Sequence, residues 1–225
     1  VRQNNRFLLY DTGQSFRNGS SYAQSVIAPY FEKERIYSKQ SSFLNDKKVP
    51  DIDYLINSHM DNDHAGGNSF IFNRYNVSQW LSPSQGCTAN DSFVWGQLQV
   101  LILWPPKIAS GNKNNHSCVI KISDGKFNVL LTGDIEKEAE QAIVKLYANS
   151  NVLNADVLVA PHHGSKTSST LPFVQAVSPR HVVVSSKYYN QWGFPHPRVL
   201  DNYSSANAAV FNTAYDGEVV FDFAD

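Results

Sequence analysis

The chain reads HMDNDHAGG at residues 59–67, directly after the apolar run Ile52–Asn57, which we interpret as a buried β-strand. Four side chains that can bind a metal fall within six positions of this stretch: His59, Asp61, Asp63 and His64. They converge only if the loop curls around a centre, and Gly66 and Gly67 are expected to let the backbone turn tightly enough. Because a divalent cation removes the repulsion between neighbouring carboxylates, the stretch predicts a metal centre at a strand end.

Two further loops carry similar residues after apolar strands. LLTGD at residues 130–134 ends in Asp134, a carboxylate placed where it can bridge two metals. VLVAPHHGS at residues 157–165 contains His162 and His163, and adjacent histidines point in different directions. One of them can therefore ligate a metal while the other faces substrate or makes a supporting hydrogen bond.

The remaining histidines are weaker indications of a functional site. GFPHP at residues 193–197 holds His196 in a loop stiffened by prolines, where an ordinary surface histidine is an equally good interpretation. His181 stands at a strand start and is expected to be structural. His116, between Asn115 and Ser117, is expected to lie near the site without necessarily binding metal.

Strands and helices alternate along the chain in a pattern typical of a layered α/β protein. Hairpins dominate the first half, and a further one is expected around Asp124-Gly125. Strand–helix alternation dominates the second half, so helices must cover the sheets and an all-β barrel is excluded. We also expect a polar insert at Arg35–Val49 and a closing strand at Glu218–Phe223. The chain is predicted to be a single domain over residues 1–225, cut from a longer protein.

The composition narrows the classes of function. With 225 residues, of which 42% are hydrophobic and 17% charged, the chain can build one sizeable core. Its 19 basic and 20 acidic residues give a net charge of -1, which excludes a strongly basic nucleic-acid coat or a polybasic membrane tether. A local basic rim around a cleft remains open. Two cysteines are too few for a disulfide scaffold, so Cys87 and Cys118 are predicted to be small buried hydrophobes.

Taken together, the motifs resemble the metallo-β-lactamase superfamily of binuclear hydrolases. The resemblance is carried by His59-x-Asp61-x-Asp63-His64-x-Gly-Gly, by Thr132–Asp134 and by Pro161–Ser165. Within the superfamily, the chain is similar to the soluble domain of the ComEC group of DNA-internalisation (competence) proteins, over nearly its whole length. The resemblance implies an α/β, four-layer αβ/βα sandwich with the metals in a cleft at the sheet edges. It also implies a soluble domain of a bacterial inner-membrane protein, with the membrane side left open and a membrane channel portion as partner.

The resemblance also assigns roles to individual residues. The implied metal ligands are His59, Asp61, Asp63, His64, Asp134 and His163, with Asp134 bridging two divalent cations. The implied catalytic set is Asp63, Asp134, His162 and His196, in which one of the two histidines is the acid or a further ligand and the other lines the cleft. Asp11 matches an acidic residue that supports the histidine loop and does not touch metal.

One departure from the family pattern bears on the metal. The superfamily's usual first motif has a second histidine where this chain has Asp61. Carboxylate oxygens suit manganese better than imidazoles do, whereas imidazole favours zinc. We therefore expect two divalent ions, with manganese preferred and zinc as the alternative.

The implied function is a metal-dependent phosphodiesterase, a DNase that acts on DNA during uptake. Polar side chains in the loops after the same strands are predicted to contact phosphates: Ser165, Lys166, Ser168, Ser169, Lys187 and Asn190. Tyr188, Tyr189 and Trp192 are either stacking partners for bases or ordinary packing residues. The alternatives are another phosphoester hydrolase, such as a phosphorylcholine esterase, and a catalytically silent DNA-binding module of a transporter. A β-lactam hydrolase is disfavoured, and no protein cofactor is implied.

Overall fold

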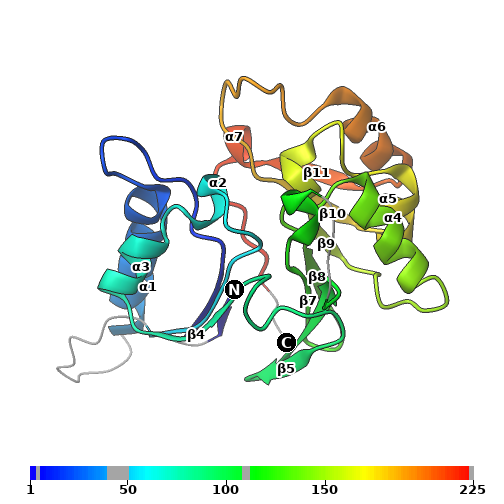
Figure 1. Cartoon of the computed structure of the whole chain (residues 1–225). Coiled ribbons are helices and arrows are strands. Elements are labelled where there is room, and N and C mark those ends of the chain that lie inside the picture. Colours follow the sequence, from blue (N-terminus) through cyan, green and yellow to red (C-terminus); the bar gives the residue numbers. More distant parts are fainter. Residues whose placement is uncertain (4–5, 40–50, 108–111, 223–225) are drawn as a thin grey trace. The chain divides into compact units, whose positions relative to one another are not determined.

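A computed structural model describes residues 1–3, 6–39, 51–107 and 112–222 of the chain. The chain divides into two compact units, Val1–Cys87 and Thr88–Asp225, each with its own sheet and its own helices (Figure 1). None of the helices in these described ranges has the length and apolar character that a membrane span requires.

The first unit is built on a four-stranded sheet in the order β1-β2-β3-β4. Its strands are β1 (Arg2–Gln3), β2 (Arg6–Tyr10), β3 (Asp51–Ile56) and β4 (Val77–Leu81). β2, β3 and β4 run parallel, so each connection must cross over the sheet. The crossovers carry a π-helical turn at Ala23–Ile27, then α1 (Ala28–Lys39), α2 (Asn62–Ala65) and α3 (Asn68–Arg74).

Helices α1 and α3 cover one face of this sheet, as Figure 1 shows in blue and cyan. Phe31 of α1 and Ile71 of α3 are buried against Phe7, Ile52 and Leu55 of the strands. The ring centroids of Phe7 and Phe31 lie 4.6 Å apart. This apolar layer fixes the sheet beneath the loops that carry the first motif.

The second unit is built on a seven-stranded sheet in the order β11-β10-β9-β8-β7-β6-β5. Its strands are β5 (Ser92–Trp95), β6 (Leu98–Trp104), β7 (Val119–Ser123), β8 (Asn128–Leu131), β9 (Val157–Val159), β10 (His181–Val184) and β11 (Ala209–Asn212). β5 to β8 pair antiparallel, and β8 to β11 pair parallel. The loops that follow β8, β9, β10 and β11 therefore leave the same edge of the sheet.

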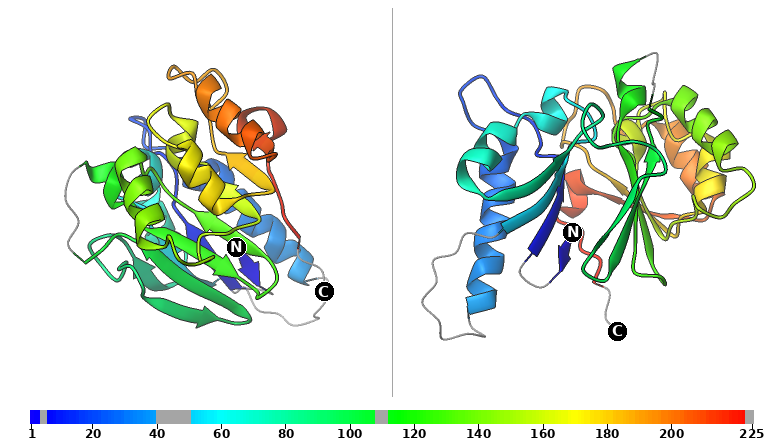
Figure 2. Two further views of the ribbon diagram at one scale, coloured as in Figure 1. Left: turned by 90° about the vertical axis from the view of Figure 1, so that its right-hand side faces the viewer. Right: turned by 60° about the horizontal axis from the view of Figure 1, so that its bottom comes forward.

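Helices of the second unit follow these loops. They are α4 (Lys137–Leu146), α5 (Leu171–Val177), α6 (Pro197–Ser205) and the short α7 (Thr213–Asp216), with 3₁₀ turns at Lys113–His116 and Pro161–Gly164. Figure 2 shows α4, α5 and α6 side by side over one face of the sheet. Phe173 and Tyr203 of these helices are fully buried against Leu130 and Leu158 of the strands.

The predicted α/β pattern is confirmed, and so is the hairpin around Asp124-Gly125, which joins the antiparallel pair β7 and β8. Three expectations are wrong. Hairpins do not dominate the first unit, because β2, β3 and β4 pair parallel. Arg35–Lys39 continues α1, because Glu, Arg and Lys are good helix formers even without an apolar pattern; residues 40–49 of the predicted insert lie outside the described residues. Residues 218–222 form no strand, since their β-like alternation finds no partner strand among the described residues, and Phe223 lies outside them.

The two cysteines also differ from expectation. Both are buried, with 3% of Cys87 and none of Cys118 exposed, as predicted. However, both are disulfide-bonded and neither is a free thiol, so the interpretation as small hydrophobes is wrong. Cysteine counts could not reveal this, because bonding depends on which sulfur atoms the fold brings within reach.

Candidate functional site

The candidate ligands of the first unit lie where two parallel strands end. Tyr10 at the end of β2 is paired with Ile56 at the end of β3, and the Asp11 amide donates to the Ile56 carbonyl at 2.9 Å. Asp11 and the segment that begins at Ser58 therefore leave the sheet at the same edge. Residues 47 positions apart in sequence become neighbours in this way.

Asp11 holds the histidine loop through Ser58. Its Oδ1 accepts from the Ser58 amide at 2.7 Å, and its Oδ2 accepts from the Ser58 hydroxyl and from His64 Nδ1, both at 2.8 Å. The prediction that Asp11 supports this loop is confirmed. Ser58 was not predicted as a site residue, and its position directly before His59 was the only available signal.

The same network decides which nitrogen of each histidine is available. The Ser58 hydroxyl lies 3.1 Å from Nδ1 of both His59 and His64. Because its single proton goes to Asp11, the hydroxyl can only accept from these rings, which keeps the proton of each histidine on Nδ1. The lone pair then sits on Nε2 of each ring, as a metal ligand requires.

Each Nε2 atom faces one carboxylate of the motif. His59 Nε2 lies 3.7 Å from Asp61 Oδ2, and His64 Nε2 lies 3.9 Å from Asp63 Oδ2. These distances exceed a hydrogen bond but approach the roughly 3.5 Å between two ligand atoms that bind one cation at about 2.1 Å. The imidazoles are buried, whereas the Asp61 and Asp63 side chains are 54% and 53% exposed. The donor set of this unit therefore fits divalent cations.

Gly66 and Gly67 serve this loop for a different reason than expected. Gly66 and Gly67 have ordinary helical backbone angles, with φ of -60° and -81°. A Cβ on Gly66 would lie 2.4 Å from the Ser15 amide nitrogen, and one on Gly67 would lie 2.5 Å from the Thr12 carbonyl oxygen. The glycines are therefore needed for close packing against residues 12–15, and not for a tight turn.

The candidate ligands of the second unit lie around Asp134, in the loop after β8. Its Oδ2 lies 3.7 Å from His162 Nε2, and its Oδ1 lies 3.6 Å from His163 Nε2. The Asp134 amide donates to the Ser117 hydroxyl at 3.1 Å, so Asp134 is held from the segment just before β7. Each carboxylate oxygen of Asp134 thus faces a different imidazole.

Backbone strain sets the direction of the paired histidines. His162 and His163 both have positive φ, 49° and 54°, in the left-handed region that costs a non-glycine residue roughly 1–2 kcal/mol. The His162 amide donates to the Gly133 carbonyl at 3.0 Å, and His163 Nδ1 donates to the Ser185 carbonyl at 2.8 Å. The second bond leaves Nε2 of His163 as the nitrogen with a lone pair, facing Asp134.

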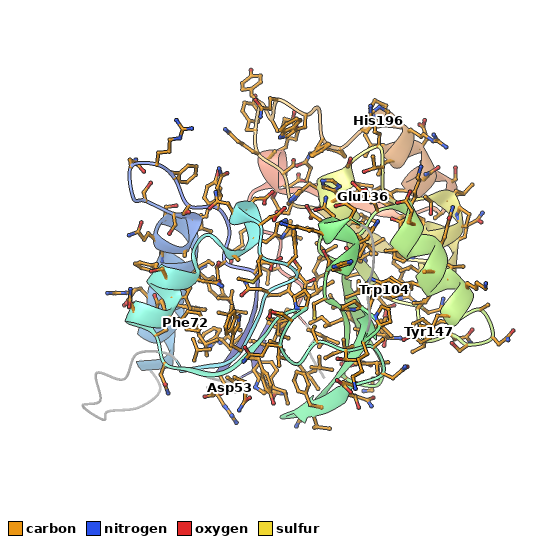
Figure 3. All side chains as sticks on the ribbon, viewed as in Figure 1. Asp53, Phe72, Trp104, Glu136, Tyr147 and His196 are labelled. Atoms are coloured by element: carbon orange, nitrogen blue, oxygen red, sulfur yellow. The ribbon has the colours of Figure 1, made fainter. Side chains whose placement is uncertain are left out.

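Glu136 is a site residue that the sequence analysis missed. Its Oε1 lies 3.2 Å from His162 Nδ1 and accepts from the Thr167 hydroxyl at 3.0 Å. Glu136 precedes α4 and is labelled in Figure 3. A carboxylate on Nδ1 orients an imidazole. The only signal in the sequence was its position two residues after Asp134.

The predicted phosphate contacts divide into two groups. Lys166 and Lys187 are exposed. In contrast, Ser165, Ser168 and Ser169 are buried, and their hydroxyls bond within the unit, for example from Ser168 to the Pro161 carbonyl at 2.7 Å. These hydroxyls are therefore not available to a phosphate that approaches from solvent. Instead, they shape the loop after His163.

Two further predicted residues have structural tasks. The Asn190 side chain closes its own loop by bonding to both backbone groups of Phe194. His196 accepts from the Arg198 amide at 3.3 Å through Nδ1 and so caps α6, at the place labelled in Figure 3. His181 starts β10 and packs on Phe211 with ring centroids 6.0 Å apart, as a structural histidine should.

A buried carboxylate supports the loop after the histidines. Glu140 of α4 accepts from the amides of Ser169 and Thr170, at 2.5 and 2.8 Å, and the Ser169 hydroxyl is 2.6 Å from the Tyr203 hydroxyl. Burial raises the pKa of Glu140 to about 7. The helix layer and the histidine loop are thus joined by a group that titrates near neutral pH.

The chain is similar in sequence to known proteins. A sequence profile of the metallo-beta-lactamase superfamily matches residues 1–186. Recombination protein 2 of Haemophilus influenzae is 37% identical over 99% of this chain and 27% of its own length. Competence protein ComA of Neisseria gonorrhoeae is 30% identical over 98% of this chain and 30% of its own. The chain thus spans less than a third of these relatives.

Among solved structures, the fold is similar to that of Tm1679, a metal-dependent hydrolase of the beta-lactamase superfamily. The TM-score is 0.50 with 11% identity, over 96% of this chain and 88% of that one. At this identity the likeness concerns the fold alone. The predicted metallo-β-lactamase fold class is confirmed by the profile match and by this likeness.

Proposed function

Because the chain belongs to the metallo-beta-lactamase superfamily, we propose that it is a metal-dependent phosphodiesterase that cleaves DNA during DNA uptake. The observation that carries the hydrolase part is the Asp134 carboxylate, whose two oxygens face two different imidazole Nε2 atoms. One of those nitrogens, on His163, has the lone pair of a metal ligand, and the other, on His162, is the one from which the proposed acid would donate its proton.

The proposed metal ligands are the six residues that the family resemblance implies: His59, Asp61, Asp63, His64, Asp134 and His163. The family supports this combination, since the superfamily profile covers both groups of residues. When bound, two divalent cations supply Lewis-acid polarisation of a phosphodiester and activation of water. With three carboxylates in the set, manganese is proposed as the preferred metal and zinc as the alternative.

The chain's own residues supply the remaining steps. His162, held by Glu136 through Nδ1, is placed to donate a proton from Nε2 to the leaving alkoxide oxygen. His196 is less suited to this role, because its Nδ1 caps α6. Lys166 and Lys187 are exposed cations that can hold phosphates on either side of the scissile bond.

DNA is proposed as the substrate because of the relatives. The names "Competence protein" and "Recombination protein" associate them with DNA uptake and recombination. As the chain spans less than a third of those proteins, the remainder of such a protein, including a membrane channel portion, is the proposed partner.

The bonding state of the cysteines indicates on which side of the membrane the proposed domain lies. Disulfides persist in oxidising compartments and are rare in the cytosol. Since Cys87 and Cys118 are both disulfide-bonded, we place the proposed domain on the outer face of the inner membrane. An amine-reactive, membrane-impermeant label applied to cells with a permeabilised outer membrane should react with the exposed Lys166 and Lys187 if the placement is right.

Activity of the metal-stripped chain tests the proposal. Addition of manganese should restore cleavage of bis(p-nitrophenyl) phosphate and of linear and circular DNA, and zinc should restore less. Asp134→Ala, His59→Ala and His163→Ala should each lower both bound metal and rate. Asp201→Ala, an exposed carboxylate on α6, is the matched control and should keep both.

The outcomes separate the alternatives. DNA binding with full metal content but without cleavage of any phosphodiester would identify a silent DNA-binding module. Cleavage of phosphorylcholine esters in preference to DNA would identify the other phosphoester hydrolase. Full activity of Asp134→Ala with both metals bound would contradict the assigned centre.

A further inference from the structure

The loop between β10 and α6 carries an unusual set of exposed aromatic side chains. Residues 186–198 contain four aromatic residues together with Lys187 and Arg198, and no acidic residue. Tyr188 is 52% exposed, Tyr189 87% and Trp192 69%. Large aromatic side chains that gather on a surface mark a site for binding another molecule.

Three tyrosines of this region form one cluster: Tyr188, Tyr189 and Tyr215. The ring centroids of Tyr188 and Tyr189 are 4.3 Å apart, and those of Tyr188 and Tyr215 are 5.3 Å apart. Tyr215 belongs to α7, which follows β11, and its side chain is 74% exposed. The rings hold one another in place while their outer faces stay in water.

This tyrosine cluster is tied to the paired histidines of the same unit. Asn190 Oδ1 accepts from the Phe194 amide at 2.7 Å, and Asn190 Nδ2 donates to the Phe194 carbonyl at 2.8 Å. Phe194 then stacks on the His163 ring, with centroids 6.5 Å apart and an angle of 19° between the planes. The exposed rings and the histidines are therefore parts of one local structure.

A second set of contacts joins the loop that carries the aromatic residues to the loop that carries His162 and His163. The His196 amide donates to the Gly164 carbonyl at 2.9 Å. A Cβ on Gly164 would lie 2.7 Å from Pro195 Cβ, so the two loops touch with no space between them. The topology explains this proximity, because β9, β10 and β11 are parallel and the loops after them leave the same edge.

Flat aromatic faces beside lysine and arginine fit a strand of nucleic acid whose bases are unpaired. Bases in a duplex are already stacked on both sides, whereas those of a single strand offer free faces to aromatic rings. Lys187 and Arg198 match the phosphates in charge, with no carboxylate in the segment to oppose them. A protein partner offers no comparable reason for this combination of stacking faces and positive charge.

We propose that the tyrosine cluster and Trp192 form a stacking surface for unpaired bases, which guides single-stranded DNA to His162 and His163. This inference rests on the proposed function and specifies its substrate as a single strand. Duplex DNA would then be cleaved mainly at frayed or separated ends.

Binding to three labelled oligonucleotides of equal length tests the inference. The full chain, kept metal-free so that nothing is cleaved, is titrated with an oligo-dT strand, a duplex and an abasic strand that keeps the phosphates. Oligo-dT should bind most tightly. Tyr189→Ala/Trp192→Ala should weaken oligo-dT binding about tenfold or more, since base stacking contributes substantially per base. Binding of this double variant to the abasic strand should weaken far less.

Conservative variants complete the test. Tyr189→Phe/Trp192→Phe keeps the rings and should restore most of the oligo-dT affinity, while circular dichroism verifies that each variant is folded. Equal loss for the abasic and oligo-dT strands, equal affinity for duplex and single strand, or no loss at all would each overturn the inference. A failure of the proposed function is distinguishable from these outcomes. In that case the manganese-loaded wild-type chain would not cleave bis(p-nitrophenyl) phosphate.

Discussion

At the scale of single residues, the site depends on supports that hold each histidine in one tautomer. Asp11 and Ser58 act on His59 and His64, and the Ser185 carbonyl acts on His163. Supports of this kind commonly change metal affinity when they are altered, even though they do not touch the metal.

The first prediction concerns Asp11→Asn. Asparagine tolerates the φ of 61° at this position, so the backbone should stay unchanged. Its amide N–H group, however, would face the Nδ1 proton of His64 and favour the tautomer that blocks Nε2. We expect metal affinity to fall by about 10- to 100-fold, measured by competition with a chelator. Asp201→Asn should leave the affinity unchanged, and an equal loss in both variants would contradict the argument.

The second prediction concerns His162 and Glu136. His162→Ala should lower kcat for DNA by about 10²–10⁴-fold with a smaller loss of metal, since a positioned acid contributes that much. Glu136→Gln should also lower kcat for DNA. p-Nitrophenolate leaves without a proton, so both variants should retain far more activity on bis(p-nitrophenyl) phosphate. If both substrates lose rate equally, His162 is a ligand and not the acid.

At the scale of elements, parallel strands bring the loops together and helix α4 holds one of them. This arrangement can be tested at two separate points. One is the contact between Gly164 and Pro195, and the other is the Glu140 carboxylate.

The third prediction compares Gly164→Ala with Gly193→Ala. Both glycines have positive φ, 79° and 66°, so both substitutions pay a backbone cost of roughly 1 kcal/mol. Only at Gly164 does the new Cβ collide with another residue, Pro195. The free energy of unfolding should therefore fall by about 1–3 kcal/mol more for Gly164→Ala. Equal losses in chemical denaturation would show that the loops can separate without cost.

The fourth prediction concerns the pH dependence of stability. Burial raises the pKa of Glu140 from 4.5 to about 7, so between these values the folded chain keeps a proton that the unfolded chain has lost. Stability from this group is complete below pH 4.5 and decreases as pH rises towards 7, by on the order of 3 kcal/mol. Glu140→Gln should be less stable overall, because its amide faces backbone donors. It should also lack this decrease when unfolding is measured from pH 4.5 to 7; a decrease as large as in the wild type would contradict the assignment.

At the scale of the whole molecule, each of the two compact units carries its own group of candidate ligands, and disulfide bonding of Cys87 and Cys118 adds covalent stability. The fifth prediction is that the denatured, unreduced chain shows no reactive thiol and the reduced chain shows two. Reduction should lower the free energy of unfolding by about 2–4 kcal/mol, seen as a lower Tm. Cys87→Ser/Cys118→Ser should match the reduced chain and be insensitive to reductant, whereas two reactive thiols in the unreduced chain would contradict the bond.

The sequence by itself determined the elements and the chemistry of the site. The α/β pattern, the strands β2, β3, β8 and β9 and the loops after them followed from local hydrophobic patterns and turn residues. The metal-binding side chains were recognisable because several stand close together in sequence, as His59 to His64 do. Their assignment as ligands remains a prediction.

Only the tertiary structure decided how these side chains are held. Asp11 and His64 are 53 positions apart, yet their hydrogen bond selects the histidine nitrogen that faces outward. Tertiary contacts also buried Ser165, Ser168 and Ser169, brought Glu136 to His162 and bonded both cysteines. The physical reason is that sequence patterns report on neighbours along the chain, whereas tautomer, burial and pairing depend on which distant segments the sheets place side by side.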